Sequence, residues 1–265
     1  MLNGKVAVVF GAGGQIGSHA CMALAKHGAT VFASGRRIES VNRTVDAIQR
    51  AGGAAEAAEV DALSDKHVDD YIAGVVERAG AVHVVFNAMG APMERGEELV
   101  CKSTELSSAR FSSYMTHSVV SQFLTARAAA RHMLERKAGV VILLGATPST
   151  GLAPFVAGAA AAHAAIEGLT RCLATEWSPA GVRVACVRAS GVQETRRIQL
   201  VRAAMARVIG IPEEQFESVA LEKALLRRSL RLSELSELVA FLASDTSASL
   251  TGTILNASCG EVMDR

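Results

Sequence analysis

Short apolar runs of strand length alternate with longer amphipathic segments from one end of the chain to the other. This alternation is typical of βαβ units, whose right-handed crossovers place helices on both faces of a parallel sheet. The predicted strands are Val6–Phe10, Thr30–Ser34, Ala54–Val60, Val82–Asn87, Val140–Leu144, Val182–Val187 and Thr253–Asn256. The predicted helices are Gln15–His27, Glu39–Ala51, Ser64–Ala79, Leu106–Arg136 and Pro154–Trp177. The pattern predicts an α/β fold, a doubly wound three-layer sandwich with a mostly parallel seven-stranded sheet.

No linker rich in proline or serine interrupts the alternation, so we expect a single domain over residues 1–265. The irregular stretch runs from Ser190 to about Phe216, and its charged sequence predicts short surface helices. This insert (190–216) is either a lid over a site or a solvated connection. Together with the loop Met89–Leu99, it is expected to line any substrate pocket.

The first strand ends in a glycine turn. In KVAVVFGAGGQIG, the apolar run stops at Gly11, and Gly14 and Gly17 follow at three-residue steps before a predicted helix. Glycine lets the backbone turn sharply and approach a ligand, and the N–H groups at a helix start attract an anion. The turn indicates the pyrophosphate site of a Rossmann-type dinucleotide-binding fold, although an ordinary glycine-rich turn has the same composition.

Composition narrows the classes of function. The chain has 265 residues, half of them apolar, and a formal net charge of +1. This balance gives no reason to expect nucleic acid or a membrane as a partner. The apolar runs are too short to span a bilayer, and the N-terminus has no signal-peptide pattern. Five scattered cysteines fit reduced thiols in a cytoplasmic protein, and no spacing suggests a metal site.

Four segments in order carry a family resemblance: the glycine turn, FNAMG (Phe86–Gly90), EGLTRCLATEWSPAGVRVACVRASG (Glu167–Gly191) and FLASDTSASLTGTILNASCG (Phe241–Gly260). Over nearly its whole length the chain resembles the short-chain dehydrogenase/reductase family. The resemblance implies an oxidoreductase that binds a nicotinamide cofactor. The cofactor-binding residues implied at matching positions are Gly11, Gly14, Gln15, Ile16, Gly17, Arg36, Arg37, Asp61, Ala62, Asn87, Ala88, Gly90, His163, Gly191 and Thr195.

The end of the second predicted strand bears on which cofactor is used. NAD-dependent enzymes need a carboxylate there for the ribose hydroxyls, but this chain has Ser34-Gly35-Arg36-Arg37. The planar guanidinium of arginine donates two parallel hydrogen bonds to a phosphate. The pair Arg36 and Arg37 therefore favours NADP(H) over NAD(H), unless both side chains only cover a solvated helix start.

The resemblance also implies a catalytic set that this chain lacks. The family uses a tyrosine as proton donor, a lysine four residues later and an upstream serine. At those positions the alignment places Ala159, His163 and Ala146, and at the family's asparagine position Ser118 or His117. Neither Tyr71 nor Tyr114 is followed by a lysine four residues later. Alanine carries no exchangeable proton, so the usual Ser-Tyr-Lys mechanism is not available to this sequence.

Candidate surrogates are His163, Tyr114 and Ser118. The imidazole of His163 titrates near neutral pH, so it could donate a proton, bond the ribose hydroxyls or only pack on an alanine-rich helix. Tyr114 lies one turn before Ser118 and either reaches the pocket mouth or belongs to an interface. The hydroxyls of Thr147 and Ser149 follow the fifth strand and are weaker candidates, because such groups commonly bond nearby backbone.

Three functions stay open. The first is an NADP(H)-dependent oxidoreductase with altered chemistry on a small molecule. The second is a protein without turnover that binds cofactor or ligand as a sensor, or as the inactive partner in a hetero-oligomer. The third is a non-redox enzyme on the same fold. The alanine run Gly158–Ala165 presents a smooth helix face, and the resemblance implies a homo-oligomer, a dimer or tetramer, packed through it.

Overall fold

The structure is a computed structural model that describes residues 1–93, 96, 99–150 and 152–263. Its strands are β1 (Val6–Phe10), β2 (Thr30–Gly35), β3 (Ala55–Glu59), β4 (Val84–Asn87), β5 (Gly139–Ala146), β6 (Val182–Ala189) and β7 (Ile254–Ala257). They form one sheet in the order β3-β2-β1-β4-β5-β6-β7, and every pairing is parallel. The predicted seven-stranded α/β fold is confirmed, with a sheet that is parallel throughout.

The strand order explains why the central strands are so apolar. Helices cover both faces of the sheet, so a central strand has no solvated side, and all five residues of β1 are buried. The chain winds outward from β1 in one direction through β2 and β3, and in the other through β4 to β7. The gap between β1 and β4 is therefore the topological switch point, outside whose carboxyl end ligands bind in open α/β sheets.

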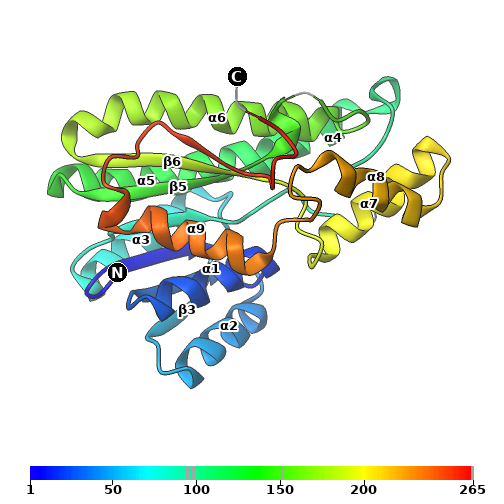
Figure 1. Ribbon diagram of the computed structural model, residues 1–265. Coiled ribbons are helices and arrows are strands. Elements are labelled where there is room, and N and C mark those ends of the chain that lie inside the picture. Colours follow the sequence, from blue (N-terminus) through cyan, green and yellow to red (C-terminus); the bar gives the residue numbers. More distant parts are fainter. Residues whose placement is uncertain (94–95, 97–98, 151, 264–265) are drawn as a thin grey trace.

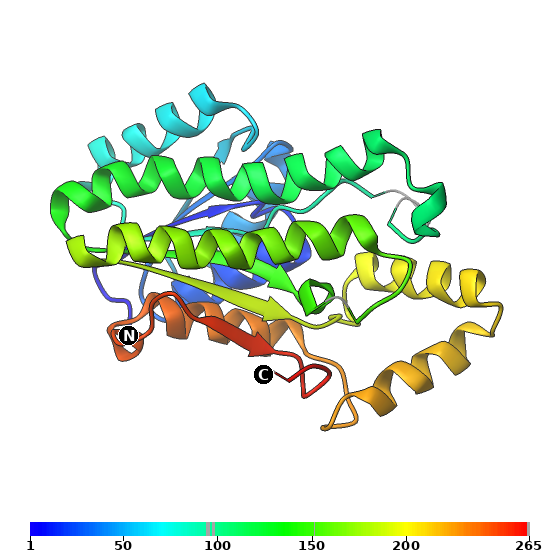
Figure 2. The same cartoon turned by 90° about the horizontal axis from the view of Figure 1, so that it is seen from above.

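Six long helices cover the sheet: α1 (Gln15–Lys26), α2 (Ile38–Arg50), α3 (Asp65–Ala79), α5 (Ser121–Arg136), α6 (Ala157–Trp177) and α9 (Leu232–Ala243). Helices α1, α2 and α9 cover one face, and α3, α5 and α6 cover the other (Figures 1 and 2). Each face has its own buried cluster, with Leu24 and Leu235 in the first and Ile72 and Ile166 in the second. The result is the predicted three-layer arrangement.

The predicted long helix before β5 begins later than expected and is not uniform. It starts at α4 (Ser108–Tyr114), passes through a π-helical segment, η3 (Met115–Val120), and continues into α5. A π-helical turn inserts an extra residue into the helix and is frequent at functional sites. Here it redirects the helix so that α4 packs against α6 beyond the edge of the sheet.

The insert predicted over 190–216 is longer than the sequence pattern indicated. It forms α7 (Arg196–Ile209) and α8 (Glu213–Lys223), which pack on each other. In Figures 1 and 2 the two helices project beyond the carboxyl end of the sheet. Their inner side joins a third apolar cluster in which Ala204 and Met205 of α7 meet Tyr114 and Ala159. The insert is thus attached to the rest of the protein at the place where a site is expected.

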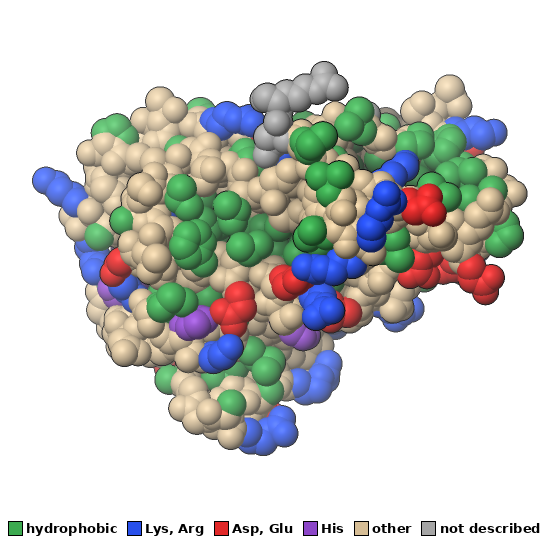
Figure 3. All heavy atoms as spheres, in the orientation of Figure 1, with side chains coloured by type: hydrophobic (Ala, Val, Ile, Leu, Met, Phe, Trp, Pro, Cys, Tyr) green, Lys and Arg blue, Asp and Glu red, His purple; other side chains and the backbone are tan. Residues whose placement is uncertain are grey.

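Basic and acidic side chains lie next to one another over the segment that joins α8 to α9 (Figure 3), where Arg228 pairs with Glu234. Within the residues that the structure describes, none of the helices has the length and apolar character needed to cross a membrane.

Candidate active site

The glycine turn has the geometry of an anion cradle. Gly11 has φ +76°, and a Cβ on Gly17 would collide with the carbonyl oxygen of Gly11. Gly14 is the N-cap of α1 and makes no side-chain cap bond, so the first N–H groups of the helix point past it. Replacing either Gly11 or Gly17 would therefore strain the turn or break the contact between the turn and α1.

The side chain of Gln15 extends from this turn to the start of α7. Its Nε2 donates to the carbonyl oxygen of Glu194 at 3.0 Å, and its Oε1 accepts from the backbone N–H of Arg196 at 2.9 Å. The neighbouring Ile16 is half-buried against the core. The amide of Gln15 thus ties the α7–α8 pair to the glycine turn, while only its backbone is left to face the turn's interior.

The carboxyl ends of β2 and β3 lie beside the turn. The N–H of Ala12 donates to the carbonyl oxygen of Ser34 at 2.9 Å, so Arg36 and Arg37 follow a residue bonded to the turn itself. Both arginine side chains are exposed. Asp61, after β3, folds back through a bond from the N–H of Leu63 to its Oδ1, at 3.0 Å. The two arginines form a basic rim next to the turn, and Asp61 lies after the neighbouring strand β3.

Asn87 connects the end of β4 to α5. It is 1% exposed, its Nδ2 donates to Thr125 at 3.1 Å, and its Oδ1 accepts from the N–H of Met89 at 2.7 Å. The N–H of Ala88 donates to the carbonyl oxygen of Phe10 at 3.0 Å. The turn after β4 is thereby fixed against the glycine turn after β1. Ala62, in contrast, is buried after β3.

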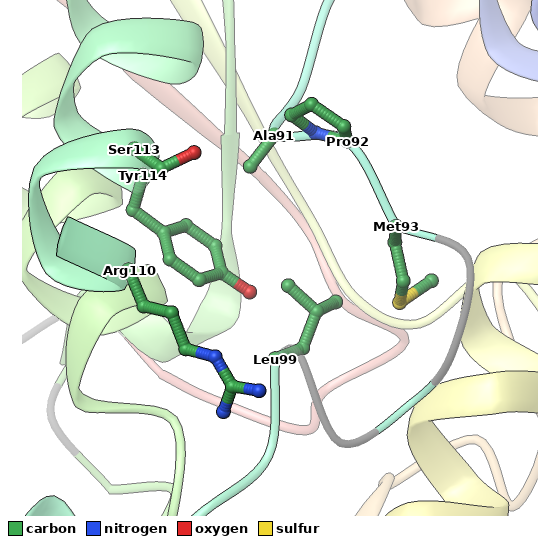
Figure 4. A pocket seen from close by; sticks show the side chains of 7 residues that line it. All are labelled: Ala91, Pro92, Met93, Leu99, Arg110, Ser113 and Tyr114. Carbon is green, nitrogen blue, oxygen red and sulfur yellow. The ribbon is translucent and has the colours of Figure 1, made fainter. Parts of the chain in front are cut away.

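The ring of Tyr114 lies on the first turn of α6. A Cβ on Gly158 would come within 2.8 Å of Tyr114 Cδ2, and Tyr114 shares an apolar cluster with Ala159. Figure 4 shows the Tyr114 hydroxyl pointing toward Leu99 across a pocket of about 260 Å³. Its lining residues are Ala91, Pro92, Met93, Leu99, Arg110, Ser113 and Tyr114. Of the loop predicted to line the pocket, residues 94, 95, 97 and 98 lie outside the described residues.

His163 lies one turn after Ala159 on α6. Its Nδ1 is buried and has no hydrogen-bond partner among the described residues. Burial and, to a lesser extent, the positive charge of Arg197 lower the pKa of His163 to about 4, against a smaller opposing effect of Glu167. The imidazole is therefore neutral near pH 7, which makes it a hydrogen-bonding group rather than a charged acid.

The remaining candidates lie around the same region. Ala146 ends β5 in register with Ala189 of β6. Ser118 is 3% exposed within the π-helical segment, and His117 donates through Nδ1 to the carbonyl oxygen of Ser113 at 2.9 Å. His117, the alternative residue at the family's asparagine position, therefore has its Nδ1 already bonded to its own helix.

The start of the α7 insert follows β6 through Gly191 and Thr195. A Cβ on Gly191 would lie 3.3 Å from Ile198 Cγ2, so this glycine packs against α7. Thr195 is the N-cap of α7: its Oγ1 accepts from the N–H of Ile198 at 3.4 Å and donates to the carbonyl oxygen of Val192 at 2.7 Å. The Thr195 hydroxyl is thus bonded within its own turn.

Two features were missed by the sequence analysis. Arg197 is half-buried beside Ala91, although its charged helix reads as solvated. The second is the buried pair of Glu167 with Arg188, joined through Nε to Oε1 at 2.6 Å and Nη2 to Oε2 at 2.8 Å. Ser149 also donates to Glu167, at 2.5 Å. The available signal was that Glu167 and Arg188 are opposite charges within two largely apolar segments, α6 and β6.

The sequence is similar to those of known dehydrogenases and reductases. A family model described as enoyl-(acyl carrier protein) reductase matches residues 11–261. The chain is 31% identical to galactitol 2-dehydrogenase (L-tagatose-forming) of Cereibacter sphaeroides, over 98% of this chain and 95% of that protein. It is 26% identical to gluconate 5-dehydrogenase of Gluconobacter oxydans (strain 621H), again over 98% of this chain and 95% of the other.

Solved structures share the fold over almost the whole chain. A variant of actinorhodin polyketide ketoreductase with NADPH superposes with a TM-score of 0.89 at 26% identity, covering 98% of this chain and 99% of that one. An NAD⁺-bound xylitol dehydrogenase gives a TM-score of 0.91 at 23% identity, with 98% and 99% covered. The second likeness shows the fold alone.

Proposed function

We propose, on the premise that this chain belongs to the short-chain dehydrogenase/reductase family, that it is an NADP(H)-dependent oxidoreductase acting on a small carbonyl compound or alcohol. In this proposal Tyr114 donates a proton to the carbonyl oxygen of the substrate, and His163 forms a hydrogen bond with the cofactor. The single observation that carries it is that the Tyr114 ring packs against Gly158 of α6, in one apolar cluster with Ala159.

The described residues fit a dinucleotide. The glycine turn presents backbone N–H groups at the start of α1, and a side chain at Gly17 would close it. The buried, unpartnered Nδ1 of His163 fits a sugar hydroxyl, because a neutral imidazole offers one donor and one acceptor. A nicotinamide cofactor held there supplies or accepts the hydride.

The preference for NADP(H) rests on Arg36 and Arg37. Both side chains are exposed at the end of β2, beside the glycine turn, where a 2′-phosphate would extend from the adenosine ribose. Guanidinium forks pair with phosphate through parallel, charge-assisted hydrogen bonds. The pair is therefore assigned to the cofactor's phosphate, with Asp61 at the adenine edge as the family resemblance implies.

The proton is proposed to come from Tyr114. At the positions implied for the family's serine and tyrosine, Ala146 and Ala159 have no polar hydrogen. The phenol of Tyr114 approaches the same turn of α6 from α4, its side chain lines the pocket, and its hydroxyl points toward Leu99 (Figure 4). Ser118, buried in the π-helical segment one turn further on, is assigned to the proton path behind it. His163 is not assigned as the acid, because its low pKa leaves it uncharged.

A second candidate function is binding of NADP(H) without turnover, as a sensor or as the inactive subunit of a hetero-oligomer. The loss of polar hydrogens at both Ala146 and Ala159 favours it, because a carbonyl would then lack a donor at its usual place. The two candidates agree on the cofactor site and differ on whether Tyr114 replaces the missing groups.

One experiment separates the two candidates. We expect purified protein to bind NADPH about tenfold more tightly than NADH in a fluorescence titration. It should then oxidise NADPH with members of a panel of ketones, aldehydes and oxo acids. The binding candidate would be supported instead by NADPH binding without turnover across the panel, together with turnover that appears in the triple variant Ala146→Ser, Ala159→Tyr and His163→Lys.

We also propose that the chain forms a homo-oligomer. Large apolar side chains are exposed along α4, η3 and α5, namely Phe111, Val120 and Phe123, and α6 exposes the small residues Ala164 and Gly168. Such a surface suits close packing of helices from a second copy. Light scattering on the purified protein tests the proposal, and a monomer at micromolar concentration would contradict it.

A further inference from the structure

Arg197 is the feature that the proposed chemistry leaves unused. It lies on the first turn of α7, and its Nη1 donates to the carbonyl oxygen of Ala91 at 2.8 Å. A Cβ on Gly90 would lie 3.7 Å from the same nitrogen. The guanidinium therefore reaches back from the insert to the loop after β4, on the side where that loop borders the pocket.

The charge of Arg197 has no acidic partner among the described residues. The ion pairs formed by arginine and lysine in the described part of the chain involve other side chains, and the guanidinium of Arg197 donates to a neutral carbonyl oxygen. Burial lowers the pKa of Arg197, with a small opposing effect from Tyr114. Arginine nevertheless stays charged in proteins, and a half-buried charge without an acidic partner carries a desolvation cost. The missing partner is expected to be an anion that arrives with a ligand.

Three groups face this region from different elements. Arg197 comes from α7, Tyr114 from α4 and His163 from α6. Arg197 is close enough to His163 to lower its pKa, and Tyr114 is close enough to act on Arg197. Arg197 also bonds the carbonyl oxygen of Ala91, which lines the same pocket as Tyr114, so an anion bound by Arg197 would lie at the pocket of the proposed proton donor. The cofactor's phosphates are already provided for by the glycine turn and by Arg36 and Arg37.

We propose that Arg197 binds the carboxylate of the substrate, so that the substrate class is the oxo acids or their hydroxy-acid counterparts. The planar fork can hold a carboxylate through two parallel bonds, which fixes the orientation of the carbonyl carbon next to it. This proposal deepens the proposed function and depends on it for the reaction, but not for anion binding. A phosphate of the cofactor has the same chemistry, and the test separates the two sources.

The test measures binding rather than turnover. Pyruvate and phenylpyruvate are titrated by calorimetry into protein saturated with NADPH, each beside its uncharged methyl ester. The wild type is expected to bind at least one acid about tenfold more tightly than its ester. Arg197→Gln keeps a donor for the carbonyl oxygen of Ala91 and should abolish that difference. Arg196→Gln, the exposed neighbour on the same turn, should preserve it.

The outcomes are distinct. Equal affinity for acid and ester in the wild type, or an unchanged difference in Arg197→Gln, overturns the proposal. Weaker NADPH binding in Arg197→Gln with the acid preference intact assigns the arginine to the cofactor and also overturns it. If Arg197→Gln unfolds, Arg197→Lys keeps the charge and should retain part of the preference. Acid binding without any NADPH oxidation would leave Arg197 assigned and contradict the proposed redox function.

Discussion

The ring of Tyr114 lies against Gly158, so closely that a Cβ at residue 158 would come within 2.8 Å of Cδ2. The two residues come from α4 and α6, and the contact exists because both are held beyond the end of the sheet. The phenol thereby reaches the turn of α6 that includes Ala159. The position of the Tyr114 ring therefore requires a small residue at 158.

Gly158→Ala tests this contact. The added methyl group must displace the ring, so we expect turnover to fall about tenfold or more with NADPH affinity unchanged. The free energy of unfolding should fall by about 1–3 kcal/mol, as in other overpacked sites. Gly74→Ala on α3 is the control, because a Cβ there would meet only the flexible end of the Arg78 side chain, at 3.2 Å. Stability and turnover equal to those of the control would show that the ring does not depend on the glycine.

The low pKa of His163 predicts a specific pH dependence of stability. As the pH falls below the ordinary value of 6.5, the unfolded chain takes up a proton at this residue before the folded chain, whose pKa is about 4. Stability is therefore lost between these values and is unaffected above them. In His163→Asn this loss disappears. Between pH 6.5 and about 5, the free energy of unfolding should fall by about 2 kcal/mol more in the wild type than in the variant.

Urea unfolding at the two pH values gives the comparison. His67→Asn, at an exposed position of α3, serves as the control and should follow the wild type. Parallel pH curves for wild type and His163→Asn would mean that the imidazole is not buried in the free protein.

Glu167→Gln should destabilise the protein strongly. The substitution removes the carboxylate of Glu167 from the guanidinium of Arg188, whose side chain is 6% exposed. Breaking one side of a buried pair costs about 3–5 kcal/mol. The expected result is a large drop in the urea midpoint. Arg171→Ala removes the exposed partner of the same carboxylate, at 3.5 Å, and should cost less than about 1 kcal/mol. Similar losses for both variants would contradict the buried pairing.

Arg36→Ala combined with Arg37→Ala tests the cofactor preference. Each lost charge-assisted hydrogen bond to a phosphate is worth about 1.5–3 kcal/mol, so the Kd for NADPH should rise about tenfold or more. The Kd for NADH should hardly move, because it has no 2′-phosphate. Arg50→Ala, at the far end of helix α2, which begins directly after Arg37, is the control. An equal effect on both cofactors would assign the two arginines to a surface role.

The fold was predictable because its signals are local. The apolar run Val6–Phe10 and the glycines that follow it lie within a dozen residues, and both were placed correctly. The carboxyl ends of parallel strands meet at one edge, so the positions of Arg36 and Asn87 followed from the strand pattern. The length of the insert was underestimated, because α8 carries few apolar residues that would mark it as helical.

The interior of the site could not be predicted in the same way. The contact of Tyr114 with Gly158 joins residues distant in sequence, and it depends on the direction in which α4 leaves the π-helical segment. Arg197 lies in a charged stretch that is typical of a solvated helix, and only the approach of Ala91 shows that it is half-buried. Glu167 reads as a surface charge until Arg188 is found opposite it.

The most direct test of the account is the turnover of Tyr114→Phe, a change that removes one hydroxyl group and keeps the ring. With any carbonyl substrate that the wild type reduces, NADPH oxidation should fall about 100-fold or more, as expected for the loss of a general acid. The Kd for NADPH should be unchanged, and Tyr71→Phe, at the other tyrosine, should behave as the wild type. Turnover of Tyr114→Phe at the wild-type rate would contradict the central claim.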